Sequence, residues 1–131
     1  MKYLIFAALA FAAGCGQSTK IGPPSFEVTK DGTKYENFNG RLEAAKVITD
    51  PGLRNDALKV LSLEAALAGY DTIARSAVEK INDPSIRNAA AKDAAHQISL
   101  LGDAKAATEI AQLITDPSIK NEVLAKIAKG Q

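Results

Sequence analysis

One eight-residue motif returns three times in this chain with a 33-residue period. Its copies begin at Ile48, Ile81 and Ile114 and read ITDPGLRN, INDPSIRN and ITDPSIKN. A fixed period between about 20 and 50 residues is typical of stacked supersecondary units, none of which can bury its apolar face alone. The repeat therefore predicts a row of similar units that pack against one another.

Each copy of the motif contains the start signal of a helix. The Asp of its Asp-Pro pair can cap the free N–H groups, and the proline takes the first helical position, where its missing N–H costs nothing. The same proline disfavours helix at the residue before it. Gly69 and Gly102 mark the ends of the first two long helices. We expect six helices in antiparallel succession, at residues 40–49, 51–68, 71–82, 84–101, 103–115 and 117–129.

Apolar residues form two adjacent stripes along the first long helix. One stripe holds Leu53, Ala57, Val60 and Leu67, and the other holds Leu58, Leu61, Ala65 and Ala68. Two stripes predict burial against more than one neighbouring helix. The last helix carries Lys126 and Lys129 near its end, and we expect it to be polar enough to close the row as a cap.

Two polar positions of the motif recur in all three copies. Asparagine is a poor residue for a helix interior, yet Asn55, Asn88 and Asn121 share one position. We favour a ladder of side-chain bonds to the turns of neighbouring repeats over a row that contacts a peptide. The basic residue four positions after each motif aspartate predicts a weak local ion pair; these residues are Arg54, Arg87 and Lys120.

Residues 40–131 resemble the bacterial α-solenoid repeats of the tetratricopeptide-like and HEAT-like families. Small residues stand where tetratricopeptide repeats need close helix contact; they are Ser62, Ala95 and Ala128, with Ala74 and Ala107 in the second helices. The aromatic positions of that family hold aliphatic residues here, and the Asp-Pro entry is more similar to HEAT repeats. The resemblance implies an all-α fold, a short right-handed α-solenoid of antiparallel helical hairpins over residues 39–131.

Residues 1–14 have the pattern of a secretory leader. Lys2 is followed by an apolar stretch of about eleven residues, shorter than the roughly 20 that span a bilayer. Ala12-Ala13-Gly14-Cys15 resembles the bacterial lipobox, which implies a signal peptide at 1–14 and a lipid on Cys15. Cys15 is the only cysteine, so an intramolecular disulfide is excluded.

Residues 15–38 differ in composition from the rest. A polar segment with Gly22, Pro23 and Pro24 is typical of a tether between an anchor and a domain. Asp31-Gly32, between apolar residues such as Val28 and Tyr35, is a two-residue turn signal. The segment is therefore either a small β-hairpin or a disordered extension of the tether.

The charge balance and the missing motifs exclude several classes of function. The chain has 16 basic and 15 acidic side chains, so it lacks the clustered positive charge that nucleic acid binding requires. It has one histidine, His96, and no second ligand type from which to build a zinc site. Phosphate loops and nucleophile motifs are absent as well. We expect no enzyme activity, no metal and no cofactor.

The resemblance also implies a binding surface on the long helices. Its ligand-facing positions fall on Asp56, Lys59 and Leu63 in the first repeat, and on Ala89, Lys92, His96 and Ser99 in the second. Lys59 and Lys92 occupy the same repeat position, where two stacked ammonium groups can engage carboxylates of a partner. A solvated face is the simpler interpretation of the same residues.

These features together predict a small lipoprotein that binds another envelope protein or peptide as a scaffold or adaptor. The alternative is a phage- or plasmid-type exclusion lipoprotein that blocks a surface receptor. Gly16, in place of aspartate after Cys15, favours the outer membrane, periplasmic side, over the inner membrane. Two and a half repeats are close to the minimum for a stable stack, which favours self-association or dependence on a partner.

Overall fold

The computed structural model describes residues 33–131. This part of the chain is all-helical, and its six helices run in the order α2 (Thr33–Lys46), α3 (Pro51–Leu67), α4 (Asp71–Glu79), α5 (Pro84–Leu100), α6 (Ala104–Ala111) and α7 (Pro117–Lys129). The leader at 1–14, Cys15 and the tether lie outside the described residues.

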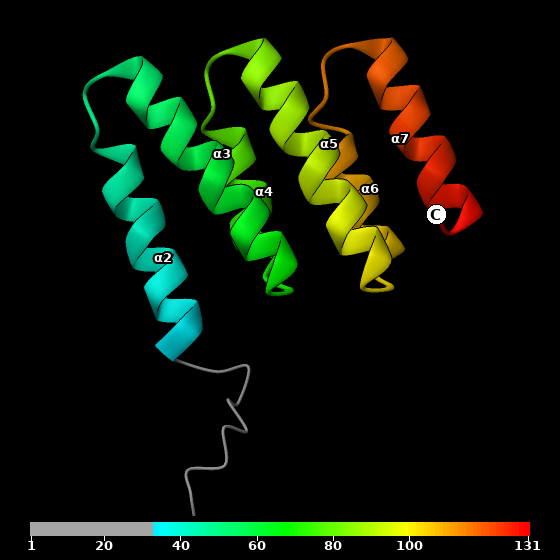
Figure 1. Cartoon of the computed structure of the whole chain (residues 1–131), viewed down its shortest axis with the longest axis horizontal. Coiled ribbons are helices and arrows are strands. Elements are labelled where there is room, and N and C mark those ends of the chain that lie inside the picture. The colour runs from blue at the N-terminus through cyan, green and yellow to red at the C-terminus, as the bar shows by residue number, and fades with distance from the viewer. Residues whose placement is uncertain (1–32) are drawn as a thin grey trace, which may run out of the picture. The chain divides into compact units, whose positions relative to one another are not determined.

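The helices form two rows (Figure 1). The first row consists of α3, α5 and α7, which lie side by side and run in one direction. The second row consists of α2, α4 and α6, which run in the opposite direction and contact one another in turn. Each helix of the first row also packs against its neighbours in the second, so apolar side chains between the rows are shielded from both sides.

The motif aspartates start all three helices of the first row, as the sequence predicts. The carboxylate of Asp50 accepts the N–H of Leu53 at 2.8 Å, and that of Asp83 accepts the N–H of Ile86 at 2.9 Å. Asp116 caps two N–H groups of α7 in the same way. Gly69 and Gly102 end α3 and α5 with φ of 79° and 90°, values that glycine adopts without strain.

Small side chains fill the space between the rows. Ser62, Ala74, Ala95 and Ala107 are all fully buried, which lets neighbouring helices approach closely. Larger residues at the middle of the core include Leu58, Ile81 and Ile114. The chain thus compensates for its few aromatic residues with close helix contacts.

Residues 33–38 form neither the second strand of the possible hairpin nor a disordered extension of the tether. Residues 33–38 belong to α2, which begins seven positions before the predicted start at 40. The ring of Phe38 lies 5.4 Å from the ring of Tyr70, and Arg41 forms an ion pair with Glu64 of α3. These contacts hold α2 against the rest of the fold. The turn signal of Asp31-Gly32 is local, so it could not reveal them. The first half of the expected hairpin lies outside the described residues.

The helices before the motifs end earlier than predicted. α2, α4 and α6 stop at Lys46, Glu79 and Ala111, a few residues short of each aspartate. After α4 and α6, though not after α2, an asparagine side chain also holds the connection that leads to the next motif. Oδ1 of Asn55 accepts the N–H of Asn82, a group that would otherwise continue α4. Asn55 and Asn88 thus confirm the structural interpretation, whereas Asn121 is exposed and forms no side-chain hydrogen bond within residues 33–131.

Two other predictions about side chains fail. In the stripe of Leu53, Ala57, Val60 and Leu67, only Ala57 packs against the core; the other three are exposed, at 65%, 53% and 57% respectively. The expected ion pairs with the motif aspartates are absent among residues 33–131, because each aspartate caps a helix instead. The guanidinium of Arg54 donates to the carbonyl of Ile48 at 3.3 Å.

Candidate functional site

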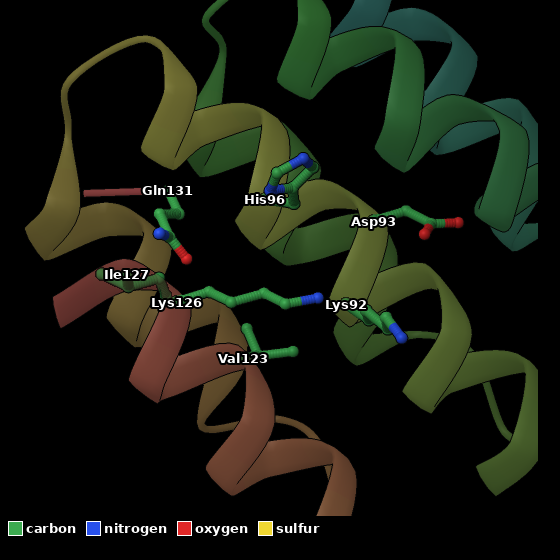
Figure 2. Close-up of a pocket in the computed structure, with 7 residues that line it drawn as sticks. All are labelled: Lys92, Asp93, His96, Val123, Lys126, Ile127 and Gln131. Atoms are coloured by element: carbon green, nitrogen blue, oxygen red, sulfur yellow. The ribbon is translucent and has the colours of Figure 1, made fainter. Parts of the chain in front are cut away.

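A small cavity of about 90 Å³ lies between α5 and α7. α5 contributes Lys92, Asp93 and His96, and α7 contributes Val123, Lys126 and Ile127, with Gln131 beyond its end (Figure 2). Val123 and Ile127 are buried and form an apolar floor. The side chain of Lys126 extends from α7 toward Lys92, whereas the carboxylate of Asp93 points away. The rim is therefore predominantly cationic.

α7, which forms one side of this cavity, is shorter than the other helices of the first row. α7 has 13 residues, whereas α3 and α5 have 17 each. His96, which lines the cavity from α5, is exposed. Gly130, with φ of 69°, ends α7 and brings Gln131 to the edge of the cavity.

One carboxylate links the two lysines beside this cavity. Oε1 of Glu122 lies 2.8 Å from Nζ of Lys126 and 3.6 Å from Nζ of Lys92. The hydrogen bond from Lys126 and the charges of both lysines lower the pKa of Glu122. All three side chains are about half exposed. The single carboxylate of Glu122 positions both ammonium groups, but its one negative charge does not neutralise both.

The structure separates the residues that the sequence groups together. Of the predicted partner-binding residues, only Lys92 and His96 line the cavity. Asp56 lines a different groove, between α2 and α3. Three further residues lie on the helices of the first row but line neither the cavity nor this groove. They are Lys59, which is exposed, and Leu63 and Ser99, which are half-buried. The α7 side of the cavity was missed, because the family resemblance pointed only to α3 and α5.

The groove between α2 and α3 is larger and more apolar, with a volume of about 570 Å³. Its walls are Arg41, Ala44, Ala45 and Ile48 from α2 and the loop after it, and Asp56, Ala57, Val60 and Leu61 from α3. We call it the end groove, because within residues 33–131 no helix of the first row precedes α3. The exposed Val60 belongs to the failed apolar stripe, which could have revealed this surface.

A third depression, about 370 Å³, lies at the turns between the helices and is basic. It is lined by Lys46, Arg54, Lys80 and Asn82. Lys46 is paired with Glu43 at 2.6 Å, which leaves Arg54 and Lys80 without an ionic partner in the described residues. The sequence did not indicate this cluster, because Lys46 and Lys80 lie outside the recurrent motif, which supplies only Arg54 and Asn82.

Between residues 33 and 131, no three side chains of the His, Cys, Asp and Glu types are grouped so that they could hold a metal ion. None of the helices in the same part of the chain is both long and apolar enough to cross a bilayer.

Comparison with known proteins gave no relative: no protein-family model, no curated protein and no solved structure matches the chain.

Proposed function

We propose that the chain is a bacterial lipoprotein whose repeats form a short right-handed α-solenoid that binds a protein of the cell envelope. The regular period of the motif supports the solenoid, because equivalent residues cap equivalent helices along the first row. The asparagine bonds also join equivalent turns, from Asn55 to Asn82 and from Asn88 to Thr115. Stacked helical hairpins of this kind expose extended surfaces suited to binding proteins.

The cavity between α5 and α7 carries the binding part of the proposal. At about 90 Å³ it is well below the roughly 300–1,000 Å³ of small-molecule sites, so it suits one side chain of a partner better than a cofactor. Its apolar floor accepts a methylene stem, and Lys92, Lys126 and His96 at the rim attract a carboxylate. The partner is therefore expected to present an acidic residue on an exposed segment.

The anchoring part of the proposal rests on the lipobox-like sequence before Cys15. A lipid on this cysteine would hold the repeats at a membrane surface, with residues 16–32 as the connection. Gly16 after the cysteine supports the periplasmic side of the outer membrane. Anchoring would also raise the local concentration of the repeats near an envelope partner.

The experiment compares the wild type with Cys15→Ser after metabolic labelling with an alkyne fatty acid. We expect label on the wild type alone, and release of the variant from the membrane fraction. Crosslinking in native membranes then retrieves the partner. An unlabelled wild type would contradict the anchor, and a labelled wild type that crosslinks to no protein would contradict the scaffold.

A further inference from the structure

The two ends of the helix rows expose positions that are buried inside them. At the α2–α3 end, Ala44 is exposed, and Ile48 and Ala57 are half-buried. Their counterparts one repeat later are Ala77, Ile81 and Ala90, and these are at most 1% exposed. The counterparts are covered because α4 and α5 pack against the preceding α2 and α3. The end groove is thus the surface to which a preceding helical pair would bind.

The outward face of α7 shows the complementary pattern. Ala128 and Asn121 are exposed, whereas their counterparts one repeat earlier, Ala95 and Asn88, are buried. The small side chain of Ala95 lets α5 and α7 approach closely. The equivalent residue of α7, Ala128, is also small, although no helix within residues 33–131 packs on it. This face of α7 therefore keeps the features of a surface that receives another helical pair, although we expected α7 to be a polar cap.

The polar groups of the two ends also match. Inside the rows, Oδ1 of Asn88 accepts the N–H of Thr115 at 2.8 Å and its hydroxyl at 3.1 Å. The counterpart of Thr115 in the first repeat is Thr49, again a threonine, and it forms no hydrogen bond within residues 33–131. The side chain of Asn121 is likewise without a partner in this part of the chain. The α7 end therefore has an unused acceptor, Oδ1 of Asn121. The α2–α3 end has the two donors that fit it, the N–H and the hydroxyl of Thr49.

The charges at the two ends are opposite in sign. Asp56, on the wall of the end groove, forms no ion pair in the described residues. Lys129, on the last turn of α7, is also exposed and unpaired there. Inside the rows, the position of Asp56 is held by Ala89 in α5 and by Glu122 in α7, and Glu122 pairs with Lys92 of the preceding helix. The end groove thus offers an acidic group where the interface between α5 and α7 has one.

We propose that a second copy of this chain docks its α7 into the end groove, so that copies stack head to tail. In the contact, Asn121 of one copy receives the N–H and hydroxyl of Thr49 of the next, as Asn88 receives those of Thr115. Ala128 approaches Ala57 and Val60. Ala125 takes the position that Lys92 has beside Glu122 and so faces Asp56, and Lys129 lies one turn further along α7. The interface continues the contacts of α3 with α5 and of α5 with α7. It goes beyond the proposed partner site, which lies between α5 and α7.

Such a contact joins two different surfaces, so each added copy leaves one groove and one α7 face free. Contacts of this type produce open chains unless the rotation between copies closes a ring. A symmetric dimer, in which two end grooves meet, would instead stop at two copies and would not involve α7. The head-to-tail chain and the symmetric dimer therefore differ in the mass of the assembly and in the residues that form the contact.

The test uses two single variants of the full chain, Ala44→Arg in the groove and Ala128→Arg on α7. Both alanines are exposed, so each variant should fold, which circular dichroism verifies. We expect the mass of the wild type, measured by light scattering, to rise with concentration. Each variant alone should remain a monomer. An equimolar mixture should form 1:1 dimers, because Ala44→Arg retains an intact α7 face and Ala128→Arg retains an intact groove.

A third variant tests the polar contact. Asn121→Ala should weaken association by about five- to tenfold, since one net hydrogen bond has roughly that value. The proposal is overturned if the wild type stays monomeric at its highest soluble concentration, as it would if another segment or protein fills the groove. It is also overturned if Ala128→Arg associates like the wild type, or if the mixture of variants stays monomeric.

Discussion

Oδ1 of Asn88 accepts the backbone N–H of Thr115 at 2.8 Å, across 27 positions of sequence. The bond joins the first turns of α5 to the connection that leads into α7. The same side chain also receives the hydroxyl of Thr115, at 3.1 Å. A single amide thus satisfies two polar groups of the next repeat, and Asn55 forms the equivalent bond to Asn82. These bonds tie α3 and α5 to the connections that lead into the next helix of the first row.

Replacing Asn88 by alanine should destabilise the fold by about 1–3 kcal/mol, because it leaves a part-buried N–H without an acceptor. Asn55→Ala should behave in the same way. Asn121→Ala is the matched control, because this residue is exposed and its effect on a dilute sample should stay within about 0.5 kcal/mol. Urea unfolding measures all three variants. Equal effects at the three positions would show that helix propensity, and not the ladder, explains the asparagines.

The helices of the first row could be predicted from sequence because their signals are local. Asp83, Pro84 and Gly102 specify the ends of α5 by chemistry within one turn, and the predicted and observed bounds differ by one residue. The start of α2 could not be found in this way. It depends on Phe38 and Arg41 meeting side chains of other helices, which no local signal encodes.

Burial was harder to predict than helix position, because it depends on which neighbours exist. Val60 has the periodicity of a core residue, yet it is 53% exposed beside the end groove. Which residues line the candidate cavity also depends on which helices are neighbours. Lys92 and His96 were predicted from the family resemblance, but Val123 and Ile127 were not, because the resemblance pointed only to α3 and α5.

Helix capping gives a second prediction, at the start of α5. Asp83→Ala should cost about 0.5–2 kcal/mol, because the N–H of Ile86 loses its acceptor. Asp83→Asn keeps a capping oxygen and is the matched control. Ala94→Pro, in the buried middle of α5, should cost about 3 kcal/mol or more. Melting followed by circular dichroism checks these effects. An unchanged melting temperature in Ala94→Pro would contradict a continuous α5.

Two glycines should respond to alanine in opposite directions. Gly40 lies inside α2, and an added Cβ would meet nothing within 4 Å, so Gly40→Ala should stabilise the fold by about 0.4–1 kcal/mol. Gly69 has a φ of 79°, so Gly69→Ala should cost about 1–2 kcal/mol. Calorimetric melting of the two variants measures the difference. A destabilised Gly40→Ala would indicate that residues 33–46 are not helical in solution.

The last prediction concerns the cavity between α5 and α7. Lys92→Glu should abolish capture of a partner that presents an acidic side chain, because the new carboxylate repels it and also repels Glu122. Lys59→Glu is the matched control: Lys59 holds the same repeat position on α3 and is exposed, but it does not line the cavity. Both variants should fold, since the two side chains are at the surface, and circular dichroism verifies this.

Capture by the wild type should weaken as the salt concentration rises, because exposed charges are screened beyond about 8 Å at physiological ionic strength. The measurement is crosslinking in native membranes, with the two variants expressed at equal levels. Loss of capture in Lys92→Glu alone assigns binding to the cavity. Equal loss in both variants would instead extend the surface along the first row to α3, as the family resemblance implies. Undiminished capture in a folded Lys92→Glu would show that the cavity does not bind the partner.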